Sequence, residues 1–138
     1  MAVDHRPLLH VEDLKVQFRV PSGILPAVDG IGFQLDRGET LGVVGESGSG
    51  KTGSSLALLR LLETPPAEIR SGSVLLEGRD LLRLSESEIS DVRGRSISMI
   101  FQEPKTSLNP VMTIGFQIDE ALMRHYGVPR REARARTL

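Results

Sequence analysis

Two stretches near the start of the chain alternate between apolar and polar residues, as half-buried β-strands do. Residues 8–20 alternate about an irregularity near Glu12 and Asp13. The apolar positions of this stretch are Val11, Leu14, Val16 and Phe18. After a Pro-Ser-Gly turn signal, residues 27–35 alternate in the same way. The pattern predicts two strands joined by a turn.

Three further stretches are more continuously apolar than the first two, and each has the length of a short strand. Residues 40–44 (TLGVV) and 96–101 (SISMIF) are short, nearly continuous apolar runs, and residues 72–78 form an apolar run between glycines. Continuous runs suit strands that are buried on both faces, as in a parallel sheet. The sequence therefore predicts a short strand at 72–78 and two buried parallel strands at 40–44 and 96–101.

Helical spacing of apolar residues occurs in four places. Residues 51–62 carry leucines on a broad apolar face and end before Thr-Pro-Pro. A Ser-x-x-Glu capping pattern at Ser85 and Glu88 opens a second helix, and Pro129 suits the first turn of a fourth. The other three predicted helices span residues 85–94, 113–127 and 129–138.

Composition narrows the class of protein. The 138 residues are 39% hydrophobic and 25% charged, which is ordinary for one globular domain. A net charge of -1 gives no global field that favours nucleic acid or an acidic membrane. Because cysteine is absent, the chain has no disulfide, thiolate metal site or cysteine nucleophile. No signal peptide or membrane-spanning apolar run is visible.

The chemistry concentrates in GESGSGKT, residues 45–52, which fits the pattern G-x-x-x-x-G-K-[ST]. Between a predicted strand and a predicted helix, such a loop exposes backbone N–H groups as an anion cradle. Lys51 would reach the β- and γ-phosphates of a nucleotide, and the Thr52 hydroxyl would bind Mg²⁺. The alternative for the whole loop is a flexible linker. The hydroxyls of Ser47 and Ser49 are expected to be spacers, with only their backbone amides taking part in binding. The candidate nucleotide-binding residues are Gly45, Ser47, Gly48, Ser49, Gly50, Lys51, Thr52 and Gly53.

Three stretches together resemble the ATP-binding subunit of an ABC transporter. They are AVDGIGFQLDRGETLGVVGESGSGKT, GSVLLEGRDL and SISMIFQEP. Phe18 stands where that family places an aromatic residue that stacks on adenine, and Gln102 stands at the position of the family's Q-loop glutamine. Without the resemblance, Phe18 could be a core aromatic and Gln102 an ordinary loop residue. Within the family, FQEPKTSLNPVMTIGFQIDEAL resembles the importers of oligopeptides, dipeptides and nickel.

The resemblance implies a fold and a division of the chain. The fold would be an α/β P-loop NTPase, with a RecA-like core and an ABC-type antiparallel β subdomain, incomplete and ending within the helical subdomain. Residues 1–101 would be the N-terminal part of the ATP-binding domain. Residues 102–138 would be the Q-loop and the start of the helical subdomain.

The resemblance also implies a mechanism shared between subunits. ATP and Mg²⁺ would be the cofactors, with Lys51 and Gln102 in catalytic positions and Thr52 and Gln102 at the metal. Two ATP-binding subunits would sandwich ATP head to tail on the cytoplasmic face of the membrane. Their partners would be permease subunits and, indirectly, a substrate-binding protein, with no nucleic acid. The residues after Gln102 would contact the permease.

Three elements of the family's hydrolytic machinery are missing from these residues. They are the signature LSGGQ, a Walker B Asp followed by Glu, and a switch His. LSES at 84–87 lacks the signature's glycines, and SMIFQE at 98–103 has Gln102 where Walker B needs a carboxylate. We therefore expect the N-terminal part of a longer subunit, inactive alone, with apolar surface exposed on its two parallel strands.

Alternatives remain at this point. The chain could be part of a soluble ABC ATPase without a permease, or a nucleotide-binding fragment that does not hydrolyse. A nucleotide kinase is disfavoured, because nothing resembles an acceptor-binding segment. A group of arginines near the end of the chain would be a solvated helix face or a permease contact: Arg124, Arg130, Arg131, Arg134 and Arg136.

Overall fold

The computed structural model describes residues 6–103 and 108–138. The chain divides into two units, Met1–Ser85 and Glu86–Leu138. A β-sheet and one α-helix make up the first unit, and the longer helices of the second unit are α4 and α5. The family resemblance places a different boundary, after residue 101, between parts of the family's ATP-binding domain. That boundary stays a prediction.

The first unit is built on a four-stranded antiparallel sheet with the strand order β2-β1-β3-β4. The strands are β1 (Leu9–Val20), β2 (Gly23–Leu35), β3 (Ala67–Leu76) and β4 (Arg79–Asp80). β1 and β2 form a hairpin across the Pro-Ser-Gly turn, and β1 also pairs with β3. The strands predicted at 8–20, 27–35 and 72–78 are confirmed, although β2 and β3 begin earlier.

The irregularity expected near Glu12 and Asp13 is a β-bulge. Asp13 has a φ of 43°, and the pairing of β1 with both neighbouring strands shifts register there. On β3, a Cβ at Gly72 would lie 2.6 Å from the Cα of Leu14 and 2.8 Å from the carbonyl oxygen of Asp13. The bulge therefore brings two backbones so close together that only glycine fits at position 72.

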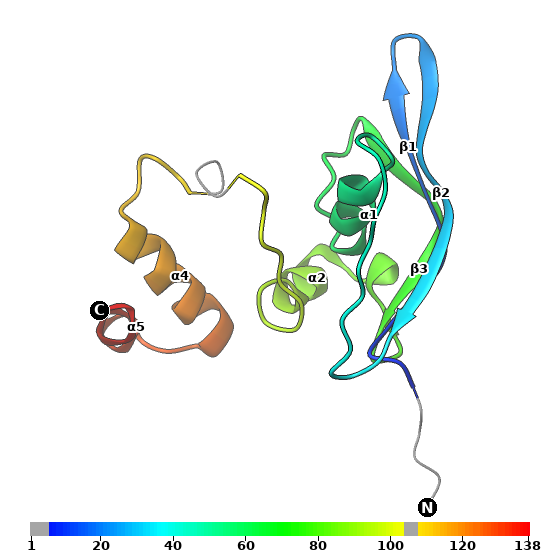
Figure 1. Cartoon of the computed structure of the whole chain (residues 1–138). Helices are drawn as coiled ribbons and strands as arrows, with labels where there is room; N and C mark the ends of the chain where they lie inside the picture. Colours follow the sequence, from blue (N-terminus) through cyan, green and yellow to red (C-terminus); the bar gives the residue numbers. More distant parts are fainter. Residues whose placement is uncertain (1–5, 104–107) are drawn as a thin grey trace, which may run out of the picture. The chain divides into compact units, whose positions relative to one another are not determined.

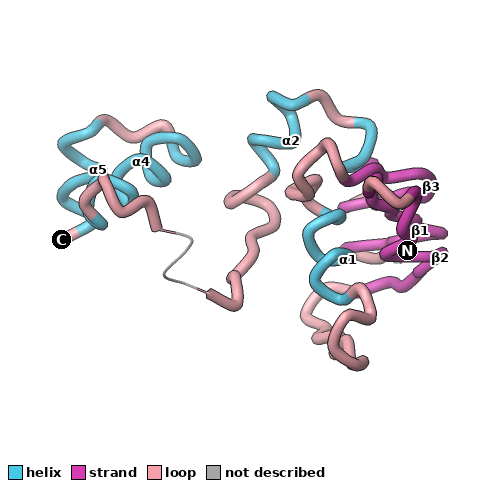
Figure 2. Tube along the Cα trace, turned by 90° about the horizontal axis from the view of Figure 1, so that it is seen from above, coloured by secondary structure: helices cyan, strands magenta, loops and turns pink. Residues whose placement is uncertain are grey.

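One face of this sheet carries the core of the first unit, and α1 (Lys51–Leu58) packs against β1 and β2 (Figure 1). Figure 2 shows the same helix lying alongside the strands. Because side chains alternate along a strand, the apolar positions of β1 gather on one face. The buried apolar residues of the unit are Leu9, Val11, Leu14, Val16, Val28, Ala57, Leu59, Ala67, Val74 and Leu81. The last of these lies in η1 (Leu81–Arg83), a 3₁₀ helix.

α1 ends four residues before the predicted stop at residue 62. Arg60 adopts a left-handed conformation with a φ of 52°, and its N–H bonds to the carbonyl of Ala57. The N–H of Leu61 bonds to the carbonyl of Leu56. These two bonds form a Schellman motif, which ends a helix by satisfying its last carbonyl groups. The chain thus turns away before it reaches the prolines.

The second unit contains α2 (Glu86–Val92), α4 (Ile114–Tyr126) and α5 (Arg130–Thr137). α4 and α5 pack against each other. The Thr113 hydroxyl accepts a hydrogen bond from the N–H of Phe116 at the start of α4, and Gly127 ends that helix with a φ of 64°. The three predicted helices of this region are confirmed to within two residues. No helix among the described residues has the length and apolar character that crossing a membrane requires.

The two predicted parallel strands are wrong for this structure. Residues 40–44 form an irregular segment, and residues 96–101 contribute only an isolated parallel bridge between Arg93 and Ile97. A strand needs neighbours for its N–H and C=O groups, and apart from this bridge the described residues supply no strand pairing at either segment. The expected apolar exposure is present, because Val44 is 96% exposed and Ile100 is 99% exposed.

Candidate functional site

The glycine-rich loop connects the exposed segment 40–44 to the start of α1 and is itself largely exposed. Gly50 is the N-cap of α1, with a φ of 90°, and a Cβ there would collide with the carbonyl oxygen of Ala27 on β2. At the other end, a Cβ at Gly45 would lie 2.7 Å from the Ser49 hydroxyl oxygen. Two glycines therefore let the loop close on itself and rest against the sheet.

Backbone N–H groups are the first binding feature of this loop. In any α-helix the first N–H groups lack an intrahelical acceptor. In α1 the first intrahelical bond is donated by the N–H of Ser54 to the carbonyl of Gly50, at 2.8 Å. No side chain caps the helix, and its first turn has no acidic residue. The donors that precede Ser54 are thus left for an external anion, beside the positive end of the helix.

The Lys51 ammonium group lies inside the loop. Its Nζ donates to the carbonyl oxygens of Gly45 at 2.7 Å and Glu46 at 2.6 Å, and to the Ser49 hydroxyl at 3.2 Å. These three bonds use all three donors of an ammonium group. A phosphate could accept a hydrogen bond from this ammonium group only if one of the three present bonds breaks. The bond to Ser49 is the longest and therefore the weakest of the three. The ammonium group is thus held within the loop by two backbone carbonyls and one hydroxyl.

The hydroxyl groups near the loop differ in what they are free to bind. Those of Ser54 and Ser55 donate to helix carbonyls, at 2.8 and 3.1 Å. Thr52 is exposed in the first turn of α1, and its hydroxyl makes no hydrogen bond within the described part of the chain. The Ser47 hydroxyl is also without a hydrogen bond in the described part of the chain, but Thr52 is the residue that carries such a hydroxyl on the first turn of α1. The described residues contain no cluster of three His, Cys, Asp or Glu that could hold a metal by itself.

Two predicted site residues lie outside the loop. Phe18 is half-buried on β1, where it pairs with Leu25 of β2 and Ala67 of β3. By strand alternation it shares the face of β1 that carries Val16. Gln102 is exposed in a bend of the second unit. The loop contacts bring together Gly45, Glu46, Ser49 and Lys51, and neither Phe18 nor Gln102 takes part in them.

Sequence reasoning missed two parts of this site. Ser49, expected to be a spacer, supplies a hydroxyl that accepts a hydrogen bond from Lys51. The carbonyl of Ala27, on the neighbouring strand, limits position 50 to glycine. No local signal could have found Ala27, because the contact joins residues 23 positions apart. The Ser49 contact is local, but it depends on the fold of the loop.

Two solved structures with a similar fold are ABC transporter cassettes. One is a dimeric bacterial ABC transporter cassette, with a TM-score of 0.77 and 21% sequence identity, which covers 93% of this chain and 53% of that chain. Another is an ATP-binding cassette in a post-hydrolysis state bound to ADP and Pi, with a TM-score of 0.74 and 19% identity. The fold is therefore that of a P-loop α/β cassette with an antiparallel β subdomain.

The family model for ABC transporters matches residues 28–137. The chain belongs to the ABC transporter family. It is 47% identical over 131 residues to the oligopeptide transport ATP-binding protein OppD of Bacillus subtilis, covering 95% of this chain and 37% of that protein. It is 48% identical over 132 residues to a putative peptide import ATP-binding protein of Brucella melitensis, covering 96% of this chain and 40% of that protein. The chain spans less than half the length of these relatives.

Proposed function

We propose that this chain is the nucleotide-binding part of an ATP-binding subunit in a peptide importer, and that it binds ATP at residues 45–53. The uncapped start of α1, with the Lys51 ammonium held inside the loop, is the observation that carries this proposal. The relatives named for oligopeptide transport and peptide import support the substrate class. Nickel is the other substrate that the importer branch suggests.

Each site residue has a proposed task. Gly45, Gly48 and Gly50 shape the loop, the backbone of Ser47 and Gly53 adds N–H groups, and Ser49 supplies the hydroxyl that holds Lys51. Lys51 exchanges its bond to Ser49 for a phosphate oxygen, and Thr52 holds Mg²⁺, which when bound neutralises phosphate charge. Phe18 offers its ring to the adenine, and Gln102 keeps the role that the resemblance implies for it, at the metal and in the coupling region of the whole protein.

The whole protein would work as a pair of ATP-binding subunits on permease subunits at the cytoplasmic face of a membrane. A substrate-binding protein would select the cargo. ATP would drive transport by favouring the closed pair, because a ligand shifts an equilibrium only by binding one state better. We propose that this chain alone binds nucleotide without turnover, since signature, Walker B and switch His are missing from its residues.

A titration with mant-ATP tests the cradle. The variants are Lys51→Ala and, as a matched control, Lys15→Ala, which removes the same charge from a β1 residue that pairs with acidic side chains. Hydrogen bonds to charged groups contribute about 1.5–3 kcal/mol, so Lys51→Ala should weaken binding by roughly 10- to 100-fold. Lys15→Ala should bind like the parent chain. Equal affinity of all three would refute the assignment.

Two further measurements separate the alternatives. An ATPase assay of this chain should show no turnover above that of Lys51→Ala, and a clear Lys51-dependent rate would contradict the proposed inactivity. Copurification of the whole protein with membrane permeases would distinguish the importer from a soluble ABC ATPase.

A further inference from the structure

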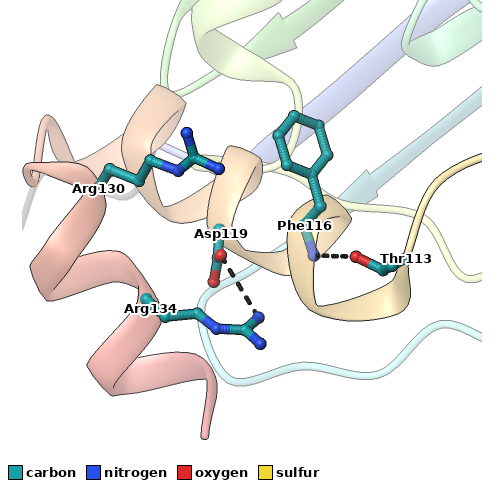
Figure 3. Close-up of a pocket in the computed structure, with 5 residues that line it drawn as sticks. All are labelled: Thr113, Phe116, Asp119, Arg130 and Arg134. Atoms are coloured by element: carbon teal, nitrogen blue, oxygen red, sulfur yellow. Dashed lines mark hydrogen bonds and ion pairs between the residues drawn. The ribbon is translucent and has the colours of Figure 1, made fainter.

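The second unit contains a pocket between α4 and α5 that the proposed nucleotide site does not use. Its volume is about 340 Å³, and it is lined by Thr113, Phe116, Asp119, Arg130 and Arg134 (Figure 3). Thr113 and Phe116 belong to the start of α4, and the two arginines lie one turn apart on α5. A pocket of this size accommodates a side chain or a small organic acid.

Asp119 is the structural centre of the pocket and needs no further partner. Among the described residues, Asp119 is the one charged residue that is buried, with a side chain and backbone only 5% exposed. Its Oδ1 accepts a hydrogen bond of 2.5 Å from the Thr137 hydroxyl, and its Oδ2 lies 3.6 Å from Nη1 of Arg134. Because Asp119 is partnered on both oxygens, it holds α4 to α5 and positions Arg134 at the pocket.

Arg130 is the cation that remains unpaired. Within the part of the chain that the structure describes, its guanidinium group makes no hydrogen bond or ion pair. Figure 3 shows that this side chain extends from α5 toward α4, with Asp119 between it and Arg134. The pocket thus holds two guanidinium groups and one carboxylate, which leaves one positive charge without a partner.

We propose that this pocket binds a carboxylate attached to an apolar stem. One negative charge balances the single unpaired charge, whereas a phosphate dianion would exceed it. Guanidinium groups match a carboxylate with two parallel N–H donors, and the Phe116 ring supplies an apolar wall for the stem. An acidic side chain of a polypeptide and a free organic acid share this chemistry. None of the residues that line the pocket belongs to the proposed nucleotide site.

The test follows the arginine side-chain N–H signals by NMR in the full 138-residue chain. The probes are butyrate, its neutral analogue butyramide, inorganic phosphate and a capped Leu-Glu-Leu peptide. The variant is Arg130→Gln, and its matched control is Arg131→Gln, which removes the same charge from the next residue outside the pocket. Both positions are exposed in the first turn of α5, so neither change removes a buried contact.

Butyrate should shift the Arg130 and Arg134 signals, and butyramide should not. Arg130→Gln should weaken butyrate binding about two- to five-fold, as expected for an exposed ion pair, while Arg131→Gln leaves it unchanged. Tighter binding of the peptide than of butyrate would assign the site to a partner polypeptide, and the reverse order to a free acid. Equal binding of butyramide, equal weakening by both variants, tighter binding of phosphate, or no shift with either carboxylate probe would overturn the proposal.

Discussion

Alanine substitutions at three glycines of the loop and helix α1 test which positions require glycine and for what physical reason. Gly53 lies in α1, and a Cβ there would meet nothing within 4 Å. Gly48 also has open space around it, but its φ is +82°. Gly50 combines a φ of +90° with the backbone of Ala27 directly in the way. Alanine at each position therefore separates helix propensity, backbone strain and steric collision.

The expected magnitudes follow from these three environments. Gly53→Ala should leave stability unchanged or raise it by up to about 1 kcal/mol, because alanine favours a helix over glycine. Gly48→Ala should cost about 1–2 kcal/mol for a left-handed conformation. Gly50→Ala adds roughly 1–3 kcal/mol for the forced shift of backbone, which makes about 2–5 kcal/mol in total.

Urea unfolding followed by circular dichroism measures the three free energies of unfolding on one scale. The order of stability should be Gly53→Ala, then Gly48→Ala, then Gly50→Ala as the least stable. If Gly50→Ala were no less stable than Gly48→Ala, the contact with Ala27 would not constrain the loop. If Gly53→Ala were as destabilising as the other two, the reasoning from φ angles would fail.

Two other predictions concern the sheet. Leu14 is 0% exposed, so Leu14→Ala should destabilise the chain by about 2–5 kcal/mol in the same urea experiment, and a loss below 1 kcal/mol would contradict its place in the core. Hydrogen bonds from Arg70, Gln17 and Arg19 lower the pKa of the Glu68 carboxyl below 4.5. Its contribution to stability is therefore present above pH 4.5 and is lost as the pH falls through the lowered pKa. Glu68→Gln should flatten that part of the curve of unfolding free energy against pH, and an unchanged curve would refute the assignment.

Elements whose stability is local were predicted well from the sequence. The helices at 113–127 and 129–138 match α4 and α5 to within two residues, because capping residues and apolar spacing act within one segment. The β1–β2 hairpin was predicted for the same reason. Even the bulge left a trace in the sequence, as a break in the alternation near Asp13.

Elements whose stability depends on residues far away in the sequence were not predicted well. Residues 40–44 and 96–101 have the composition of buried strands, yet in this structure they are irregular and exposed. Apolar composition gives a segment a tendency to be buried, but a strand forms only where neighbouring strands accept its hydrogen bonds. No spacing rule within the segment can show whether such neighbours are available.

The glycine-rich loop shows the same division. The sequence by itself determined the residue types, spacing and helix start that an anion cradle needs, because each of these depends on covalent neighbours. The tertiary structure decided how the loop closes. The collision of any side chain at Gly50 with Ala27, and the positioning of Lys51 by Gly45, Glu46 and Ser49, exist only after the sheet and loop have folded. Tertiary packing therefore decides the geometry of the closed loop, while the local sequence already indicates the kind of site proposed for it.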